Sequence, residues 1–229
     1  MPRQAPWSRP WAFLARQHPS ALLLAAQLLS LLIYPSVDDT SSGRLLFGAV
    51  ALVVVPLAVW VVARTPAESY VAWVLAIPAM LLTAAGVILD QPALLPWSAA
   101  LEALLYFYAA GSLIVYMMND HEVSADELFA AGATFTLLAW GFAYAYFVCQ
   151  QVYPDSFESF HEPERPRRWL ELLSFSFSNL SATGLSDIMP VGSPARVLVM
   201  LEQFAGVGYI ATVVSRLIGL TIVRQERRQ

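Results

Sequence analysis

The stretch SFSFSNLSATGLSDIMP, residues 174–190, decides how the rest of the chain is arranged. With the residues before it, it predicts a helix over Trp169–Ala182 of about three to four turns, roughly 20 Å long, which is too short to cross a hydrocarbon layer of about 30 Å. Its serines and Asn179 would be costly against lipid and should face protein or water. Non-helical backbone at membrane depth is tolerated only where protein or a watery cavity covers it. The stretch therefore predicts a re-entrant helix and loop in the wall of a pore.

Composition places this stretch in a membrane protein. The chain has 229 residues, of which 58% are hydrophobic and 13% charged, with a mean hydropathy of +0.57. Soluble domains are about half apolar. All thirteen basic residues are arginine, the formal net charge is −4, and no basic stripe points to nucleic acid. The single Cys149 excludes an intramolecular disulfide, and three dispersed histidines offer no metal-ligand spacing.

Six apolar runs predict an all-α polytopic fold with six transmembrane helices. The first run is short and follows a basic segment, as in a signal peptide, but no small-residue cleavage site comes after it, so we expect a retained helix. Each later run supplies about 20 residues, enough to span the bilayer at about 1.5 Å per residue. The runs are 20–33, 45–63, 70–89, 97–118, 128–149 and about 195–223.

An even number of spans puts both termini on one side of the membrane. The flanking arginines are modestly biased toward that side, and cytoplasmic flanks carry such an excess. We therefore expect a multi-pass protein of the cytoplasmic membrane with both termini in the cytoplasm.

Residues 1–118 are expected to form an N-terminal four-helix domain and residues 119–229 a pore domain with helix 5, the pore helix, the filter and helix 6. The fourth span contains no arginine, whereas voltage sensors move several charges through the field. It carries Glu102 instead. A carboxylate in this position has either a functional role or a structural role beside a polar neighbour.

The residues after the short helix predict an ion path. A helix C-terminus carries partial negative charge and favours a cation in front of it. Thr183–Asp187 is expected to run extended toward the outer mouth, with Gly184 supplying unusual backbone angles. Four such segments around an axis would replace a cation's water shell with carbonyl oxygens. One chain supplies one copy, so this interpretation requires a homotetramer.

From about Asp126 to Gly219 the sequence resembles the tetrameric potassium-channel pore module, in its prokaryotic two-helix ion-channel-domain form. The residues that carry the resemblance are the Phe-Ser-Phe run at 175–177, Gly184, Asp187-Ile188, Pro190, Pro194-Ala195-Arg196, Leu201-Glu202, Gly206, Tyr209 and Arg216-Leu217-Ile218-Gly219. The resemblance implies a tetrameric pore with a selectivity filter between its two helices.

The filter departs from the family pattern, which reads Thr-Val-Gly-Tyr-Gly-Asp. The aligned residues are Ala182, Thr183, Gly184, Leu185, Ser186 and Asp187. Ala182 removes a hydroxyl, Leu185 removes a bracing ring, and Ser186 replaces a glycine where positive φ would cost about 1 kcal/mol or more. We expect a filter that is wider, collapsed or differently folded. Potassium or sodium would then be permeant ions of weak selectivity.

Four residues of the last helix are candidates for gating or bracing. Gly206 and Gly208 offer either a hinge or close helix packing. Glu202 is expected behind the pore helix. Arg216 is expected near the inner end, where it reaches lipid phosphates or the pore mouth. We expect bracing rather than ion contact from Glu202 and Arg216.

The sequence thus predicts a homotetrameric, cation-channel-like protein in the lipid bilayer, without cofactor, soluble partner or nucleic acid. One alternative is a channel relative that does not conduct and acts as a sensor or scaffold. Another is a membrane enzyme or transporter, although Glu102, Asp187 and Glu202 are the only acids near the spans and no paired broken helices are found.

Overall fold

The computed structural model describes residues 18–34, 54–65, 67–89, 91–119, 124–159, 165–216, 218, 219 and 222. Its helices are α2 (Pro19–Ile33), α4 (Ser69–Ile88), α5 (Leu95–Asn119), α6 (Ala125–Val152), α7 (Trp169–Leu180) and α8 (Ser193–Tyr209). A 3₁₀ turn, η2 (Pro92–Leu94), precedes α5, and a π-helical segment, η3 (Ile210–Val214), continues α8. Residues 54–62 are also helical.

Within the described residues, four helices are long and apolar enough to cross a membrane. They are α4, α5, α6 and the continuous run of α8 with η3, Ser193–Val214. The first predicted span corresponds to α2, which has only 15 residues. Half of the second predicted span, 45–63, lies outside the described residues. The structure therefore supports an α-helical membrane protein with four candidate spans.

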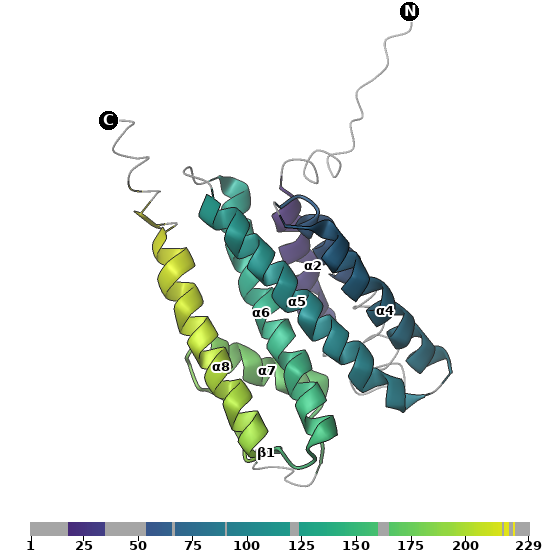
Figure 1. The fold of residues 1–229 in the computed structure, drawn as a ribbon. Coiled ribbons are helices and arrows are strands. Elements are labelled where there is room, and N and C mark those ends of the chain that lie inside the picture. Colours follow the sequence, from purple (N-terminus) through teal and green to yellow (C-terminus); the bar gives the residue numbers. More distant parts are fainter. Residues whose placement is uncertain are drawn as a thin grey trace, which may run out of the picture.

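Helix α6 is the centre of the bundle. It contacts α2, α5, α7 and α8, and Figure 1 shows the short α7 lying between α6 and α8. Large side chains such as Trp140 and Tyr146 on α6 are fully buried. Because α7 packs against both α6 and α8, these two long helices decide where the short helix can sit.

An aromatic cluster fixes the first residue of α7. The Trp169 ring packs against Tyr34, Trp140 and Tyr144, with ring centroids 5.4–5.5 Å apart. Tyr106 of α5 packs against the rings of both Trp140 and Tyr144. Aromatic pairs at these separations add favourable edge and offset contacts to their buried area. The start of α7 is therefore held by aromatic side chains of α6, by Tyr34 at the end of α2 and, through them, by α5.

The beginning of α6 is capped and joined to α2. Ser124 Oγ accepts a hydrogen bond from the Glu127 backbone N–H at 3.2 Å and caps the helix. Asp126, itself buried, accepts from the Ser20 N–H at 3.1 Å and from the Ser20 hydroxyl at 2.9 Å. A carboxylate at a helix N-terminus also meets the positive end of the helix dipole. Asp126 therefore ties α2, the first described helix, to the beginning of α6.

Two short strands that the sequence did not predict join the loops on either side of α7. Strand β1 (Phe157–Ser159) pairs antiparallel with β2 (Ile188–Pro190), with Glu158 opposite Met189. The Ser156 carbonyl accepts from the Val191 N–H at 2.9 Å. The residues that follow the predicted filter are thereby anchored to the end of α6.

Candidate functional site

The N-terminus of α7 is set by polar contacts around Arg165, Arg167 and Arg168. Glu171 in the first turn accepts from the Arg168 N–H at 2.7 Å and pairs with the Arg165 guanidinium at 2.5 Å. The Gln150 side chain donates to the Arg167 carbonyl at 2.8 Å and accepts from the Arg167 N–H at 3.0 Å. The acidic first turn also suits the helix dipole. These contacts hold the start of α7 against the end of α6.

The C-terminus of α7 ends in a Schellman motif. The Thr183 N–H donates to the Ser178 carbonyl at 3.1 Å, and the Ala182 N–H donates to the Asn179 carbonyl at 3.0 Å. Ala182 occupies the left-handed position of this motif with φ 58°. Glycine is usual at that position because an L-residue there costs roughly 1–2 kcal/mol. The predicted helix end at Ala182 is thus two residues beyond the observed last helical residue, Leu180.

The predicted extended run from Thr183 is wrong at its start. Gly184, with φ 66°, donates its N–H back to the Ser178 carbonyl at 3.2 Å. The Ser186 N–H then donates to the Gly184 carbonyl at 3.1 Å. The expected positive φ at Ser186 is also not observed, since the non-glycine residues with positive φ in the described chain are Asp155 and Ala182. The segment is folded differently from an extended filter, as one of the sequence-based expectations allowed.

The side chains of this segment are exposed in the single chain. All six residues from 182 to 187 are exposed, and the exposed fraction of Leu185 is 82%. Asp187 is held by a 2.9 Å hydrogen bond from the Ser159 hydroxyl of β1. The exposed segment is available to line an aqueous path or to contact another subunit.

Glu202 lies behind α7 and is completely buried. Its carboxylate contacts the Tyr146 hydroxyl of α6 through Oε2 and the Ser176 hydroxyl of α7 through Oε1. The Ser176 hydroxyl also lies 2.8 Å from the Ala139 carbonyl. This cluster joins α6, α7 and α8 at one point.

Gly206 and Gly208 have different surroundings. A Cβ on Gly206 would overlap the carbonyl group of Leu180, the last residue of α7, at 2.8 Å from its carbon and 3.0 Å from Cα. A Cβ on Gly208 would meet nothing within 4 Å. Close packing of α8 on the end of α7 therefore accounts for Gly206. A hinge role for Gly208 stays a prediction.

Arg216 contacts the end of α5. Its guanidinium donates to the Met117 carbonyl and, at 3.2 Å, to the Met118 carbonyl. Cations favour this end of a helix because its last carbonyls carry partial negative charge. Seven residues earlier, the Tyr209 hydroxyl donates to the Ala131 carbonyl of α6 at 2.6 Å. The π-helical η3 lies between these two attachments. These contacts agree with the bracing role expected for Arg216, and its partners are carbonyls of α5 rather than lipid phosphates or the pore mouth.

Glu102 of α5 belongs to a separate cluster, which meets α6 on another face. It is buried, accepts from the Thr83 hydroxyl of α4 at 2.9 Å and hydrogen-bonds with Tyr144. The structure thus gives Glu102 polar neighbours and does not bring it to the exposed segment 182–187. Glu102 and Glu202 are each matched with a tyrosine of α6, and the two tyrosines are two residues apart.

Sequence reasoning missed Thr83, Tyr144 and Tyr146, and it placed Ser176 against protein or water without identifying Glu202 as its partner. A usable signal was available for the tyrosines, because a buried tyrosine hydroxyl usually finds a hydrogen-bond partner. Two tyrosines in the last third of the apolar run 128–149 therefore indicated two polar partners. A single sequence did not reveal which acid matched which tyrosine.

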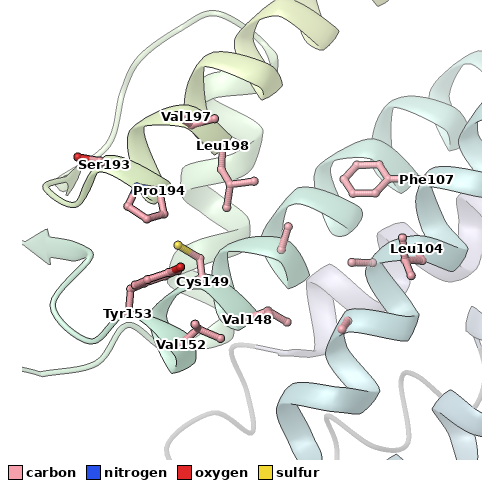
Figure 2. Close-up of a pocket in the computed structure, with 13 residues that line it drawn as sticks. Leu104, Phe107, Val148, Cys149, Val152, Tyr153, Ser193, Pro194, Val197 and Leu198 are labelled. Atoms are coloured by element: carbon pink, nitrogen blue, oxygen red, sulfur yellow. The ribbon is translucent and has the colours of Figure 1, made fainter.

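A cavity of about 730 Å³ opens between α5, α6 and α8 (Figure 2). Its walls are apolar, with Leu104 and Phe107 of α5 on one side and Val197 and Leu198 of α8 on the other. Tyr153 and Ser193 also line it, but almost no polar surface faces the cavity, so it does not suit a cation that needs several oxygen ligands. Within the described part of the chain, no group of three or more histidine, cysteine, aspartate or glutamate side chains could hold a metal ion.

The chain matches one family model, described as "Ion channel", over residues 103–222. The match covers just over half of the chain and includes most of α5 and all of α6, α7 and α8. No curated protein and no solved structure matches the sequence.

Proposed function

This chain belongs to the ion channel family, and on that premise we propose that it passes monovalent cations with weak selectivity through a homotetrameric pore. The segment from Ala182 to Asp187 would form the constriction, and Asp187 would draw cations to its outer mouth. The family consists of non-enzymatic transporters, so the protein is not an enzyme. Potassium and sodium would be permeant ions rather than cofactors.

The observation that carries this proposal is the placement of α7. This 12-residue helix, about 18 Å long, lies between two candidate spanning helices and ends at an exposed turn. Polar backbone in a membrane must be sheltered by protein or water. Four copies around an axis would supply that shelter for residues 182–187.

The outer face of α8 supports assembly of several chains. Phe204 is 80% exposed in the single chain, and Met200, Leu201 and Val207 are each more than half exposed. These residues lie on the helix that follows the predicted filter. In the proposed tetramer they would face neighbouring subunits, the pore or lipid.

The remaining architecture is proposed as the sequence predicts it. Six spans, counting α2 and the run 45–63, would place both termini in the cytoplasm and the protein in the cell membrane. Residues 1–118 would form the N-terminal membrane domain and residues 119–229 the pore domain. The residues that would brace or gate the pore are Glu102, Glu202, Gly206, Gly208 and Arg216. The proposed channel would need no soluble partner.

A second candidate function is favoured by the Schellman motif. The Ser178 carbonyl accepts from the N–H groups of both Thr183 and Gly184, which turns the backbone back on the helix. A segment that kept this turn in the tetramer would not present a column of carbonyls to an ion. The protein would then be a non-conducting channel relative that acts as a sensor or scaffold. The direction of the four Gly184 carbonyls in a tetramer structure distinguishes the two functions.

Ion flux through proteoliposomes tests the main proposal. We expect measurable potassium and sodium flux of similar size from the purified protein and little divalent-ion flux. A variant with Leu185→Tyr and Ser186→Gly restores two family residues and should increase the preference for potassium. Liposomes without protein provide the background. Absence of monovalent flux under every gradient would reject conduction and favour the second candidate.

A further inference from the structure

The Glu202 cluster contains one more short oxygen–oxygen contact than its hydroxyl groups can supply with hydrogens. The contacts run from Tyr146 to Glu202, from Glu202 to Ser176 and from Ser176 to the Ala139 carbonyl. Each needs one hydrogen between its two oxygens. Tyrosine and serine hydroxyls carry one hydrogen each, and a carbonyl carries none. The third hydrogen has to come from the carboxyl group.

A charged Glu202 would leave one contact unsatisfied. If the Ser176 hydroxyl donated to an ionised carboxylate, its oxygen and the Ala139 carbonyl would face each other at 2.8 Å without a hydrogen. Among the described residues, the ion pair of the structure joins Arg165 to Glu171, and the polar side chains that contact Glu202 are Tyr146 and Ser176. Burial of an unpaired charge is expensive, and more so within a membrane.

We propose that Glu202 is an uncharged acid whose proton positions α7. Glu202 donates from Oε1 to Ser176, Ser176 donates to the Ala139 carbonyl, and Tyr146 donates to Glu202 Oε2. Every hydrogen in the cluster then lies in a contact, and α7 is attached to α6 and α8 through a single serine. Glu202 is a positioning residue, since it touches the pore helix and not the segment 182–187.

This inference deepens the proposed function, because α7 is the pore helix of the proposed channel. The contacts that position α7 do not themselves depend on ion flux. The Gly206 contact with Leu180 lies one helical turn after Glu202, on the same side of α8. Glu202 and Gly206 therefore fix α7 at its middle and at its end. Figure 1 shows α7 between the two helices that these contacts join to it.

Infrared spectroscopy of the purified protein tests the protonation state directly. We expect the wild-type spectrum minus that of E202Q to show the carbonyl stretch of a protonated carboxyl group. The amide that E202Q introduces keeps a donor and an acceptor at the same positions, so this variant should fold as the wild type does. A difference spectrum that shows an ionised carboxylate band instead would overturn the proposal.

Hydrogen exchange of the α7 backbone tests the positioning role. S176A removes the attachment, whereas S178A removes a buried hydroxyl of the same helix that has no hydrogen-bond partner. We expect S176A to increase exchange across 169–183 severalfold and S178A and E202Q to leave it unchanged. Equal exchange in S176A and S178A would reject the role of Ser176 and Glu202.

Neither measurement requires the protein to conduct. A wild-type protein without flux but with the protonated carboxyl band would reject the proposed conduction and keep this inference. A protein with flux and an ionised Glu202 would support the proposed conduction and overturn this inference.

Discussion

Ala182 holds a backbone conformation that its side chain disfavours, and this residue makes the turn after α7 testable. Replacing Ala182 with glycine removes a left-handed penalty of roughly 1–2 kcal/mol and adds about 0.5–1 kcal/mol of chain entropy cost. We expect A182G to raise the free energy of unfolding by about 0.5–1 kcal/mol. Chemical denaturation of the purified protein measures this change.

Ser181 provides the matched control for A182G. Its φ of −79° is ordinary for L-residues, so S181G gains nothing and should cost up to about 1 kcal/mol. Stabilisation by both glycines, or by neither, would contradict a left-handed Ala182.

Alanine substitutions at Gly206 and Gly208 distinguish a glycine that is needed for close helix packing from one that is not. A methyl group at Gly206 overlaps the backbone of Leu180, so G206A should destabilise the protein by about 1–3 kcal/mol. G208A enters open space and should be neutral or slightly stabilising, because alanine favours helix. Thermal unfolding of the two variants checks this difference, and equal midpoints would show that α8 does not approach α7 at Gly206.

At the scale of elements, the helices were the most predictable part of the chain. Apolar runs of about 20 residues left few alternatives for α4, α5 and α6, and the polar serines marked α7 as sheltered. The three-residue strands β1 and β2 were not predictable, since their pairing joins segments on opposite sides of α7 and short apolar runs do not encode such contacts. The turn after α7 was misassigned because the family's filter pattern, in which Ser186 replaces a glycine, pointed to Ser186 rather than Ala182 as the strained position.

Arg216 links the ends of two elements. Its loss removes hydrogen bonds to the last carbonyls of α5 and a favourable charge at that end, together about 1–2 kcal/mol. R216Q should therefore lower the unfolding midpoint by about 3–6 °C. R196Q is the control, since Arg196 makes an exposed 3.2 Å contact with the Pro190 carbonyl and its removal should change the midpoint by less than about 2 °C. Similar shifts in both variants would count against capping of α5.

At the scale of the whole molecule, the proposal requires four copies of the 25.2 kDa chain. We expect native mass spectrometry in detergent to show a tetramer, because residues 182–187 and the outer face of α8 are exposed in the single chain. A charged substitution, Phe204→Glu, should weaken assembly, whereas Leu81→Glu on the exposed face of α4 should not. A monomeric wild-type protein would reject the tetrameric pore.

The partners of the buried acids show what a single sequence cannot provide. Glu202 and Tyr146 are 56 residues apart, and Glu102 and Thr83 belong to different helices. Bracing by Glu202 was expected from its place behind the pore helix, and a polar neighbour was one of the two alternatives for Glu102. Their identities depend on how α6 is turned between its neighbours, which hydrophobic periodicity fixes poorly for a helix buried on most sides.

The bond between Asp126 and Ser20 bears on the modularity of the chain. Cutting at residue 119 would yield a unit with the two long helices α6 and α8. The Asp126 carboxylate in its first turn would lose its contacts with Ser20, and Trp169 would lose its contact with the Tyr34 ring. Side-chain contacts therefore cross the domain boundary that the sequence predicts between residues 118 and 119. We expect an excised half to be destabilised by the loss of α2 and α5 and by the unpaired charge of Asp126, and D126N would remove only the last of these.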